Sequence, residues 1–446
     1  MTLELHPKCK ARLIAAVAAA IPKLNVEYGH YVDRYPASLE LKNAEAVLPD
    51  KGALREQLTS YIDFETPLTE FLIDSITEEL QQFPYERKRS LQPLTSISNY
   101  KDSQSVAERL IESFAALPTK YTFSLKLPSA FLPMIGPRAK VEISPQLRIV
   151  KSGPELSALY PPEITVSPAI AEASKIAGML SGLFDTFMKP PATWDSDSVY
   201  LQADVFGFVG LYGGTNPHLE AVRIIRAFCG LGVALQLFEM KSEYSSLTPP
   251  PSYLQIHRQC ADDRFEFYRS LSLNDNVSRA MNGLTLDTVG GRINSERRQL
   301  DWADMQFESI RAVFAGGEKA GAILLASQWF FDGHSHGSDQ LLKYIQTTVV
   351  LEILLGDKAS SDQTGLGILL GNRCAYLIGS SQEERADVLN TFTEIYGIRS
   401  QIVHRGKHRL SNRERVLFHK LRWMCRRVIY REIELLKADK ESKLPA

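Results

Sequence analysis

The chain of 446 residues is long enough for two or three domains, and its 44% hydrophobic and 23% charged residues are ordinary for a globular protein. Its formal net charge is −1, and its five dispersed cysteines show no Cys-x-x-Cys spacing, which argues against a disulfide framework or a zinc module. No apolar stretch approaches the length needed to span a bilayer, so we expect a cytoplasmic protein without membrane contact.

The first part of the chain favours helices. Its apolar run 13–21 follows three basic residues, but the run is short, rich in alanine and followed by proline, which predicts a surface helix rather than a secretory signal. Apolar residues recur at helical spacing in three further segments, 54–62, 72–80 and 107–114. We therefore expect a mainly helical segment over residues 1–116.

The middle of the chain changes to an alternation of apolar and polar residues that is typical of strands. Strands are predicted at 121–127, 140–144, 147–150, 163–166, 198–212, 231–238 and 253–257. A helix is expected over 170–187, and Asn216-Pro217 predicts the start of another, because asparagine caps helices and proline fits their first turn. These elements predict a mixed α/β region at 117–295, which either stands alone or forms one sensor domain with residues 1–116.

The last third returns to helical spacing with strongly apolar faces, which is the composition of a helical bundle. Helices are predicted at 295–315, 317–333, 339–356, 365–379, 382–405 and 411–437. The predicted fold class is therefore a multidomain protein, with a mixed α/β (α+β) N-terminal region followed by an all-α bundle at 296–446.

The segment 394–406 combines polar chemistry with a predicted helix end. Arg399, Ser400 and His404 stand against apolar residues at helical spacing, and Gly406 offers a left-handed stop. Arginine is a permanent cation that can hold a phosphate, and histidine exchanges a proton near neutrality. The pair therefore suits phosphodiester chemistry without a metal. The alternative is a basic helix end that only favours the helix dipole.

Basic residues are concentrated around this segment. Between Arg399 and Arg431 the chain has eleven Lys or Arg and one acid, Glu414, so this window carries +10 and the remainder of the chain about −11. Such a cluster beside an Arg/His pair indicates a polyanionic partner such as RNA. The residues that we expect to contact RNA are Arg405, Lys407, Arg409 and Arg413. The alternative is a solvated helix face.

The segment 396–406, Tyr-x-x-Arg-Ser-x-Ile-Val-His-x-Gly, resembles the terminal motif of the HEPN superfamily in its Apea-like branch. Three upstream pieces fit the same branch in the same order, namely Gln328-Trp-Phe-Phe-Asp332, Leu351-Glu-Ile-Leu-Leu355 and Asn372-Arg-Cys-Ala-Tyr-Leu377. The resemblance covers residues 315 to 430, about a quarter of the chain.

The resemblance implies a small helical bundle that pairs as a homodimer. Many HEPN proteins are metal-independent endoribonucleases that act as toxins in antiviral defence and abortive infection. By this resemblance Arg399 and His404 are catalytic, and Ser400 occupies the polar position between them. Some members are inactive and only bind nucleotides, RNA or partners, which is the alternative function here. On an ideal helix residues five apart differ by about 140° and about 7.5 Å, so the pair meets one phosphate through the arginine's reach or across a two-fold axis.

Glu352 is the carboxylate that we expect to support this site. It lies in an apolar helix, where a buried glutamate requires a partner. Arg373 and Arg399 are the two candidates for that partner. The pair either orients the catalytic arginine or is a structural ion pair, whose loss costs roughly 3–5 kcal/mol if it is truly buried.

A polar turn between two predicted helices contains residue types that bind metals, Asp332, His334, His336 and Asp339. Glycine-rich connections of this kind are more often polar turns than metal sites. We expect neither a metal nor a cofactor, since the proposed chemistry requires none. The resemblance to HEPN proteins of antiviral defence implies that the large N-terminal region senses an invader or holds the nuclease off, with a phage-derived trigger or an inhibitory partner as the controlling molecule.

Overall fold

The structure is a computed structural model. It describes residues 3–27, 31–81, 91–162, 194–211, 215–240, 252–260, 262–286, 296–334, 339–356 and 365–441. The predicted strand 163–166, the predicted helix 170–187 and His336 lie outside these residues. The chain forms two compact units, one of residues 1–122, 204–222 and 258–264, the other of residues 123–203, 223–257 and 265–446. This grouping cuts across the three ranges expected from the sequence.

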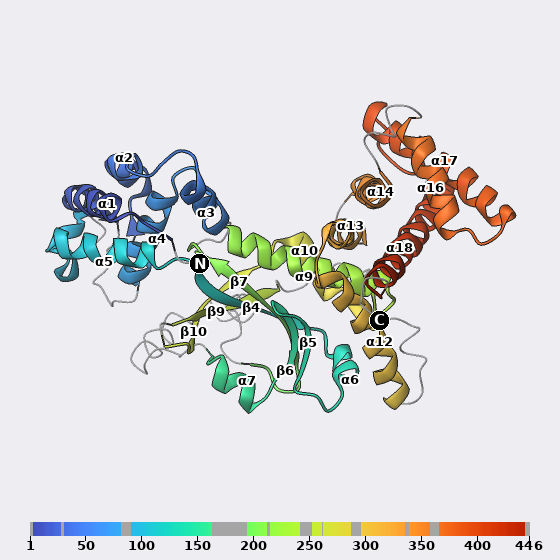
Figure 1. The fold of residues 1–446 in the computed structure, drawn as a ribbon, viewed down its shortest axis with the longest axis horizontal. Coiled ribbons are helices and arrows are strands. Elements are labelled where there is room, and N and C mark those ends of the chain that lie inside the picture. Colours follow the sequence, from blue (N-terminus) through green and yellow to red (C-terminus); the bar gives the residue numbers. More distant parts are fainter. Residues whose placement is uncertain are drawn as a thin grey trace, which may run out of the picture. The chain divides into compact units, whose positions relative to one another are not determined.

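The first unit contains a cluster of helices, drawn in blue to cyan in Figure 1. Its helices are α1 (Pro7–Ala20), α2 (Arg34–Glu45), α3 (Ala53–Tyr61), α4 (Pro67–Gln81) and α5 (Ser103–Ala115). Short strands β1 (Asn25–Glu27), β2 (Tyr31–Val32) and β3 (Gln92–Pro93) form a small antiparallel sheet. The predicted helical character of this segment is confirmed. Helix α1 buries Leu13, Val17 and Ala20 in the core and exposes its other face.

A six-stranded sheet, counted over the described strands, has the order β10-β9-β4-β7-β6-β5. The strands are β4 (Thr119–Leu127), β5 (Lys140–Ser144), β6 (Leu147–Lys151), β7 (Val199–Gly207), β9 (Tyr253–Gln259) and β10 (Phe265–Ser272). Strands β5, β6 and β7 pair antiparallel, with Ile149 opposite both Val141 and Leu201. The strands predicted at 121–127, 140–144, 147–150 and 253–257 are confirmed.

Further elements accompany this sheet. They are helices α6 (Leu132–Ile135), α7 (Pro154–Leu159), α9 (Asn216–Ala234) and α10 (Asp275–Asn282), and the paired strands β8 (Phe238–Met240) and β11 (Leu284–Leu286). Asn216 does begin a helix, as predicted. The predicted strand 231–238 is wrong, because α9 continues through Ala234 and only residue 238 belongs to a strand. The last turn of α9 is buried, and a fully apolar segment does not distinguish a helix from a strand.

The predicted strand 198–212 is too long, because β7 ends at Gly207. Gly207 has a φ of +146°, a conformation that favours glycine, and the next residue, Phe208, donates its N–H to the Tyr61 carbonyl instead of to the sheet. A methyl group at Gly207 would lie 2.6 Å from that carbonyl oxygen. The chain therefore leaves the sheet here.

The helical bundle contains six described helices, all at predicted positions. They are α12 (Glu296–Phe314), α13 (Glu318–His334), α14 (Gln340–Leu355), α16 (Leu366–Ile378), α17 (Gln382–His404) and α18 (Asn412–Glu441). Helix α18, red in Figure 1, contacts each of the other five. Buried aromatic residues fill the centre, among them Phe307, Phe330, Phe331, Tyr344 and Phe392. None of the helices in the described residues is long and apolar enough to cross a membrane.

The bundle packs closely against helix α9. A methyl group at Gly230 in α9 would overlap the carbonyl oxygen of Ser327 in α13, so only glycine permits this approach. Beside it the Arg226 guanidinium forms an ion pair with Asp332, with Nε 3.1 Å from Oδ1. Helix α12 contacts β5 and α6 as well, and Arg138 NH1 lies 2.6 Å from Asp304 Oδ1. Bundle and sheet are therefore joined by buried as well as charged contacts.

Candidate functional site

Helix α17 carries the predicted motif at its C-terminal end. The Ser381 hydroxyl accepts the Glu384 N–H at 3.1 Å and begins the helix, as a capping serine does. The helix ends at His404, and Gly406 follows with a φ of +65°, which confirms the predicted left-handed stop. Arg399, Ser400 and His404 therefore all lie on the last two turns.

Glu352 and Arg399 form an ion pair between α14 and α17, with Glu352 Oε1 3.2 Å from Arg399 Nε. The Nε–H is not aligned for a hydrogen bond to any described residue, so the contact is mainly electrostatic. The side chains are 20% and 23% exposed, which makes the pair half-buried rather than buried. The terminal nitrogens of Arg399 make no hydrogen bond to described residues and remain available to an anion.

Tyr396 completes this group, and our sequence reasoning gave it no role. Its hydroxyl lies 3.5 Å from Glu352 Oε1, and the Arg399 guanidinium carbon lies 5.7 Å from its ring centroid. Burial, followed by the Glu352 carboxylate, raises the pKa of the Tyr396 hydroxyl, which therefore stays protonated and donates to Glu352. The sequence did contain a signal for the contact of Tyr396 with Arg399, because residues three apart lie on the same face of a helix.

Helix α16 supports the Tyr396 ring from the other side. A methyl group at Gly367 would lie 2.8 Å from Tyr396 Cδ1, which requires the glycine for this close approach. The ring also stacks on Phe392, at 5.9 Å between centroids and 13° between planes. Three helices thus fix the orientation of one tyrosine, and through it the carboxylate and the arginine.

Arg373 was considered as a partner of Glu352, but the structure shows it in another contact. Its NH1 donates to the carbonyl of Leu355 at 2.8 Å, at the end of α14. A cation at a helix C-terminus satisfies an unpaired carbonyl and the helix dipole. Of the two candidate partners of Glu352, the structure thus places Arg399 on the carboxylate and Arg373 on the helix end.

His404 is exposed at the last residue of α17, and Ser400 is half-buried one turn before it. Neither side chain makes a hydrogen bond or ion pair within the part of the chain that the structure describes. The structure therefore brings together Arg399, Glu352 and Tyr396, and leaves His404 as an unrestrained group at the surface.

A basic pocket of about 590 Å³ lies directly after His404, in the connection between α17 and α18. Its charged and titratable lining residues are Arg405, Lys407, His408, Arg409, Glu414 and Arg415. Arg405 and Arg409 are exposed and contact no carboxylate among the described residues. His408 and Arg415 were not singled out from the sequence, although both belong to the basic window.

Glu414 fixes the shape of this connection. The Ser411 hydroxyl faces the Glu414 N–H at 3.4 Å, while Glu414 Oε2 accepts the Ser411 N–H at 2.7 Å, which is a capping box at the start of α18. Glu414 Oε1 lies 2.8 Å from Lys407 Nζ. Lys407 is therefore partly a structural residue. Arg413 points to a different acid, with NH2 2.7 Å from Glu394 Oε2.

One arginine of the basic window faces the interior of the bundle. Arg422 donates to the Gly333 carbonyl at 2.8 Å and stacks 4.3 Å from the Phe418 centroid. Burial lowers the pKa of Arg422 to about 10. Burial, and then the nearby Arg422 charge, lowers the pKa of Lys343. The basic window is thus not one continuous surface, and Arg422 serves packing.

The potential metal ligands in the polar turn each contact a different group of the protein. Asp332 pairs with Arg226, His334 Nδ1 lies 2.8 Å from the Phe330 carbonyl, and Asp339 accepts the Leu341 N–H as the cap of α14. No group of three or more metal-ligating side chains occurs among the described residues.

No protein-family model, no curated protein and no solved structure matches this chain.

Proposed function

We propose that the chain is a metal-independent endoribonuclease whose active site lies on α17 of a HEPN-like bundle. The observation that supports this best is the arrangement around Arg399. Its guanidinium is oriented by Glu352 and Tyr396 with its terminal nitrogens available, one helical turn from an exposed histidine and beside a basic pocket. Cations, a proton-transfer group and a polyanion-binding surface are what cleavage of RNA without a metal requires.

Arg399 would bind the scissile phosphate through its terminal nitrogens and stabilise the charge that develops on it. His404 would accept the proton of a ribose 2′-hydroxyl, or donate one to the leaving 5′-oxygen. The 2′-oxygen then attacks phosphorus and the P–O5′ bond breaks, with solvent water taking the proton transfer that His404 does not, which leaves a 2′,3′-cyclic phosphate and a 5′-hydroxyl. Ser400 would position the phosphate or the histidine. DNA lacks the 2′-hydroxyl and is not a substrate of this mechanism.

A second copy of the bundle would complete the site. His404 has no group within the described residues that orients its ring, and Arg399 lies about 140° around the helix from it. A homodimer in which two copies of α17 face each other would place His404 of one copy near Arg399 of the other. The resemblance to HEPN proteins implies such dimers.

Purified protein incubated with RNA in excess EDTA tests the proposal. We expect cleavage to persist, to leave 2′,3′-cyclic phosphate ends, and to be lost in both His404→Ala and Arg399→Ala. His419→Ala is the matched control, because His419 is also exposed on a basic helix outside the motif. Strict dependence on Mg²⁺ or Mn²⁺, or full activity of His404→Ala, would contradict the mechanism.

A defence role follows from the same resemblance, and we propose that the nuclease acts as a toxin or abortive-infection effector. Cells that express the wild type or the two variants, with and without phage challenge, test it through growth and total RNA. Toxicity and RNA fragmentation that appear only in the wild type support the role. Intact RNA in the wild type during phage challenge contradicts it.

The alternative is an inactive bundle that binds RNA, nucleotides or a partner. The exposed basic pocket favours it, because Arg405 and Arg409 provide phosphate contacts whether or not His404 is catalytic. It predicts salt-dependent RNA binding without cleavage and tolerance of His404→Ala in cells.

The net acidity of the rest of the chain suggests that it masks the basic nuclease face. Removal of residues 1–295 would test this, but it would also remove α9, against which α13 packs. The folding of the remaining bundle must therefore be measured first. A folded bundle that is less toxic than the whole protein would contradict masking.

A further inference from the structure

Helix α18 has a single line of exposed apolar side chains on its solvent face. Val416, Trp423 and Tyr430 are 59%, 43% and 41% exposed. They lie seven residues apart, so they point in nearly the same direction and follow one another at intervals of about 10.5 Å along the helix. The opposite face of α18 is buried in the bundle, through Leu421 and Val428 among others. The line is therefore at the surface and available to a partner.

Basic side chains flank the middle of this line on both sides. Lys420 and Arg426 lie three residues before and three residues after Trp423, so both are its neighbours on the helix surface. At about 100° per residue, they point about 60° to either side of the ring. Neither makes a hydrogen bond or ion pair within the part of the chain that the structure describes. Trp423 is thus an exposed ring between two cations whose charges are not compensated.

This basic face extends from the basic pocket to the position before Tyr430. Arg415, in the first turn of α18, belongs to the lining of the pocket. At the other end a hydrogen bond to Glu434 raises the pKa of the Tyr430 hydroxyl, and Arg431 pairs with the same carboxylate at 2.5 Å. Trp423 lies eleven residues, or about 16 Å, beyond the start of α18. A chain-like ligand that occupies the pocket can therefore reach Trp423 along the helix.

The pattern does not fit a second copy of the helix. A coiled coil requires apolar residues at two positions of each heptad, and the positions three residues after Val416 and Trp423 are His419 and Arg426. Two α18 helices paired along this line would also bring Lys420 and Arg426 of both copies together, and like charges repel. A helix that binds a membrane surface needs a broad apolar face, which one line of side chains does not provide.

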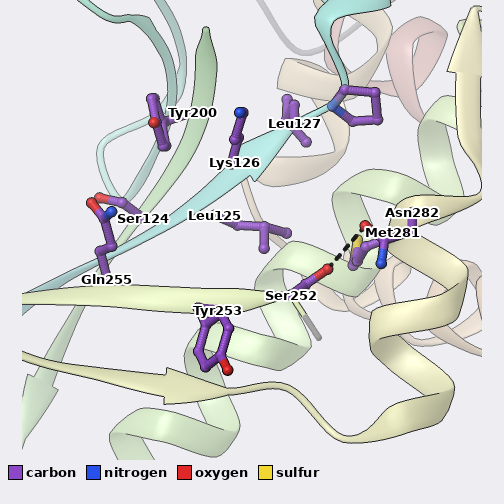
Figure 2. A pocket seen from close by; sticks show the side chains of 11 residues that line it. Ser124, Leu125, Lys126, Leu127, Tyr200, Ser252, Tyr253, Gln255, Met281 and Asn282 are labelled. Carbon is purple, nitrogen blue, oxygen red and sulfur yellow. Dashed lines mark hydrogen bonds between the residues drawn. The ribbon is translucent and has the colours of Figure 1, made fainter. Parts of the chain in front are cut away.

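The pocket between strands β4 and β9, drawn in Figure 2, differs from α18 in the state of its polar groups. Lys126 is the one charged residue of its lining, and its Nζ lies 2.6 Å from Asp195 Oδ2. A chain of hydrogen bonds ends on its Ser124 hydroxyl, which accepts from the Gln202 amide at 3.0 Å, and Gln202 in turn accepts from Arg148 Nε at 2.9 Å. The cations that flank the α18 line have no such partners among the described residues.

An exposed ring with a cation on each side fits a single-stranded nucleic acid. Every base has a flat face that can stack on an aromatic side chain, while the cations contact the phosphates on either side of it. In a duplex the bases are paired and stacked on one another, so they offer no open face to Trp423.

We infer that helix α18 binds single-stranded RNA, with one unpaired base stacked on Trp423 and the adjacent phosphates on Lys420 and Arg426. The strand continues past Arg415 into the basic pocket. This inference rests on the proposed role of that pocket in binding RNA, but it does not require that the RNA is cleaved.

Fluorescence anisotropy of labelled RNA tests the inference on the full chain carrying His404→Ala, so that the RNA stays intact during the measurement. In this parent, Trp423→Ala should weaken the binding of an unstructured single strand by roughly 5- to 150-fold, as expected for the loss of one base–aromatic stack. Binding of a duplex of the same length should not change, because its bases are not open for stacking. Trp423→Phe keeps a ring and should bind more tightly than Trp423→Ala.

Tyr35→Ala is the matched control for the ring. Tyr35 is 75% exposed on α2, but the residues three and four positions away from it carry no charge, so its loss should not affect binding. Lys420→Gln and Arg426→Gln should each reduce the slope of log affinity against log salt by about 0.7, as the loss of one phosphate contact to a single strand does. Lys51→Gln, an exposed cation of the first unit, should leave the slope unchanged.

The inference is overturned if the folded parent binds no single-stranded RNA, if folded Trp423→Ala binds it as the parent does, or if single strand and duplex lose affinity equally. If Trp423→Ala does not fold, unchanged salt slopes in both Lys420→Gln and Arg426→Gln overturn it. Binding to vesicles of phosphatidylserine and phosphatidylcholine that falls in Trp423→Ala, with RNA binding intact, overturns it in favour of a membrane surface. A wild-type chain that binds single strands through Trp423 without cleaving them contradicts the ribonuclease proposal and supports this inference.

Discussion

Glu352 Oε1 lies 3.2 Å from Arg399 Nε, and about a fifth of each side chain remains exposed to solvent. Because of this exposure, the effect of the ion pair on the orientation of Arg399 can be measured apart from its effect on the stability of the fold. A fully buried pair that loses one partner costs roughly 3–5 kcal/mol, whereas an exposed pair is worth about 0–1 kcal/mol. A half-buried pair lies between these limits, so a variant of Glu352 can remain folded while Arg399 loses its orientation.

The first prediction concerns Glu352→Gln, which keeps the shape of the side chain and removes its charge. We expect the free energy of unfolding to fall by about 1–2 kcal/mol, between the exposed and buried limits. RNA cleavage by the folded fraction should fall by at least tenfold, because Arg399 is no longer held for the phosphate. Urea unfolding and a cleavage assay on the same sample measure the two effects. If Glu352→Gln cleaves RNA as fast as the wild type, the Glu352–Arg399 pair has only a structural role.

The second prediction compares two variants of Tyr396. Tyr396→Phe removes only the hydroxyl that faces Glu352 at 3.5 Å, a long contact, so unfolding should change by less than about 1 kcal/mol and cleavage should fall only severalfold. Tyr396→Ala also removes the ring beside Gly367, Phe392 and Arg399, and should cost about 3 kcal/mol with nearly complete loss of cleavage. Equal activity of the two variants would show that the ring does not position Arg399.

The sequence predicted the bundle well because its signals there are local. Ser381 caps α17, Gly406 ends it, and the apolar spacing between them is helical. The partner of Glu352 could not be predicted in this way, because Arg373 and Arg399 have the same chemistry and only tertiary packing decides between them. Tyr396 lies three residues before Arg399, so spacing within α17 could have indicated their contact, but its contacts with α14 and α16 depend on tertiary packing.

Errors arose where burial removes periodicity. The end of α9 is apolar on all sides, so it was predicted as a strand, although Gly232 there packs directly against Phe238. The hydrogen-bond chain from Arg148 to Ser124 joins strands β6, β7 and β4. No sequence pattern shows which polar side chains meet across a sheet when long segments separate the strands.

The third prediction separates binding from structure in the connection between α17 and α18. Arg409→Ala should weaken RNA binding and reduce the slope of log affinity against log salt by about one, as the loss of one phosphate contact does. Lys407→Ala should also lower stability, because Lys407 contacts Glu414 at 2.8 Å and the Gln401 side chain at 3.3 Å. RNA binding measured over a series of salt concentrations tests this. An unchanged slope in Arg409→Ala would contradict the assignment.

The fourth prediction concerns acid stability and His257. This ring is buried, stacks on Trp194 at 5.5 Å, and its Nε2–H donates to the Pro161 carbonyl at 2.9 Å. Burial lowers the pKa of His257 to about 4, while the unfolded chain titrates near the ordinary value of about 6.5. Between these values the unfolded state binds more protons, so stability should fall by up to about 3 kcal/mol as the pH decreases from 6.5 to 4.

His257→Phe removes the titrating group and keeps a ring. Its stability at neutral pH should be lower because the Pro161 carbonyl loses its donor, but its decline from pH 6.5 to 4 should be smaller than that of the wild type. Urea unfolding at several pH values measures both. Parallel decline of the two proteins would assign the acid sensitivity to other groups.

The fifth prediction uses two glycines of the bundle region. Gly230→Ala should destabilise by about 1–3 kcal/mol or more, because the methyl group would overlap the Ser327 carbonyl oxygen. Gly321→Ala, in α13, is the control: no atom approaches its methyl position, so it should stabilise by about 0.5–1 kcal/mol through helix propensity alone. Thermal unfolding of both variants tests whether the packing of α13 on α9 contributes to stability.

Helix α18 begins at the basic pocket and ends beside α12, where Lys440 Nζ donates to the Ala312 carbonyl at 2.9 Å. The thirty residues of α18 form a helix about 45 Å long, so a small rotation about one end produces a large displacement at the other end. A rotation of 5° about its α12 end displaces the other end by about 4 Å, more than the length of one hydrogen bond. Because α18 also contacts the other five helices of the bundle, such a displacement at the charged surface next to His404 requires those helices to shift with it.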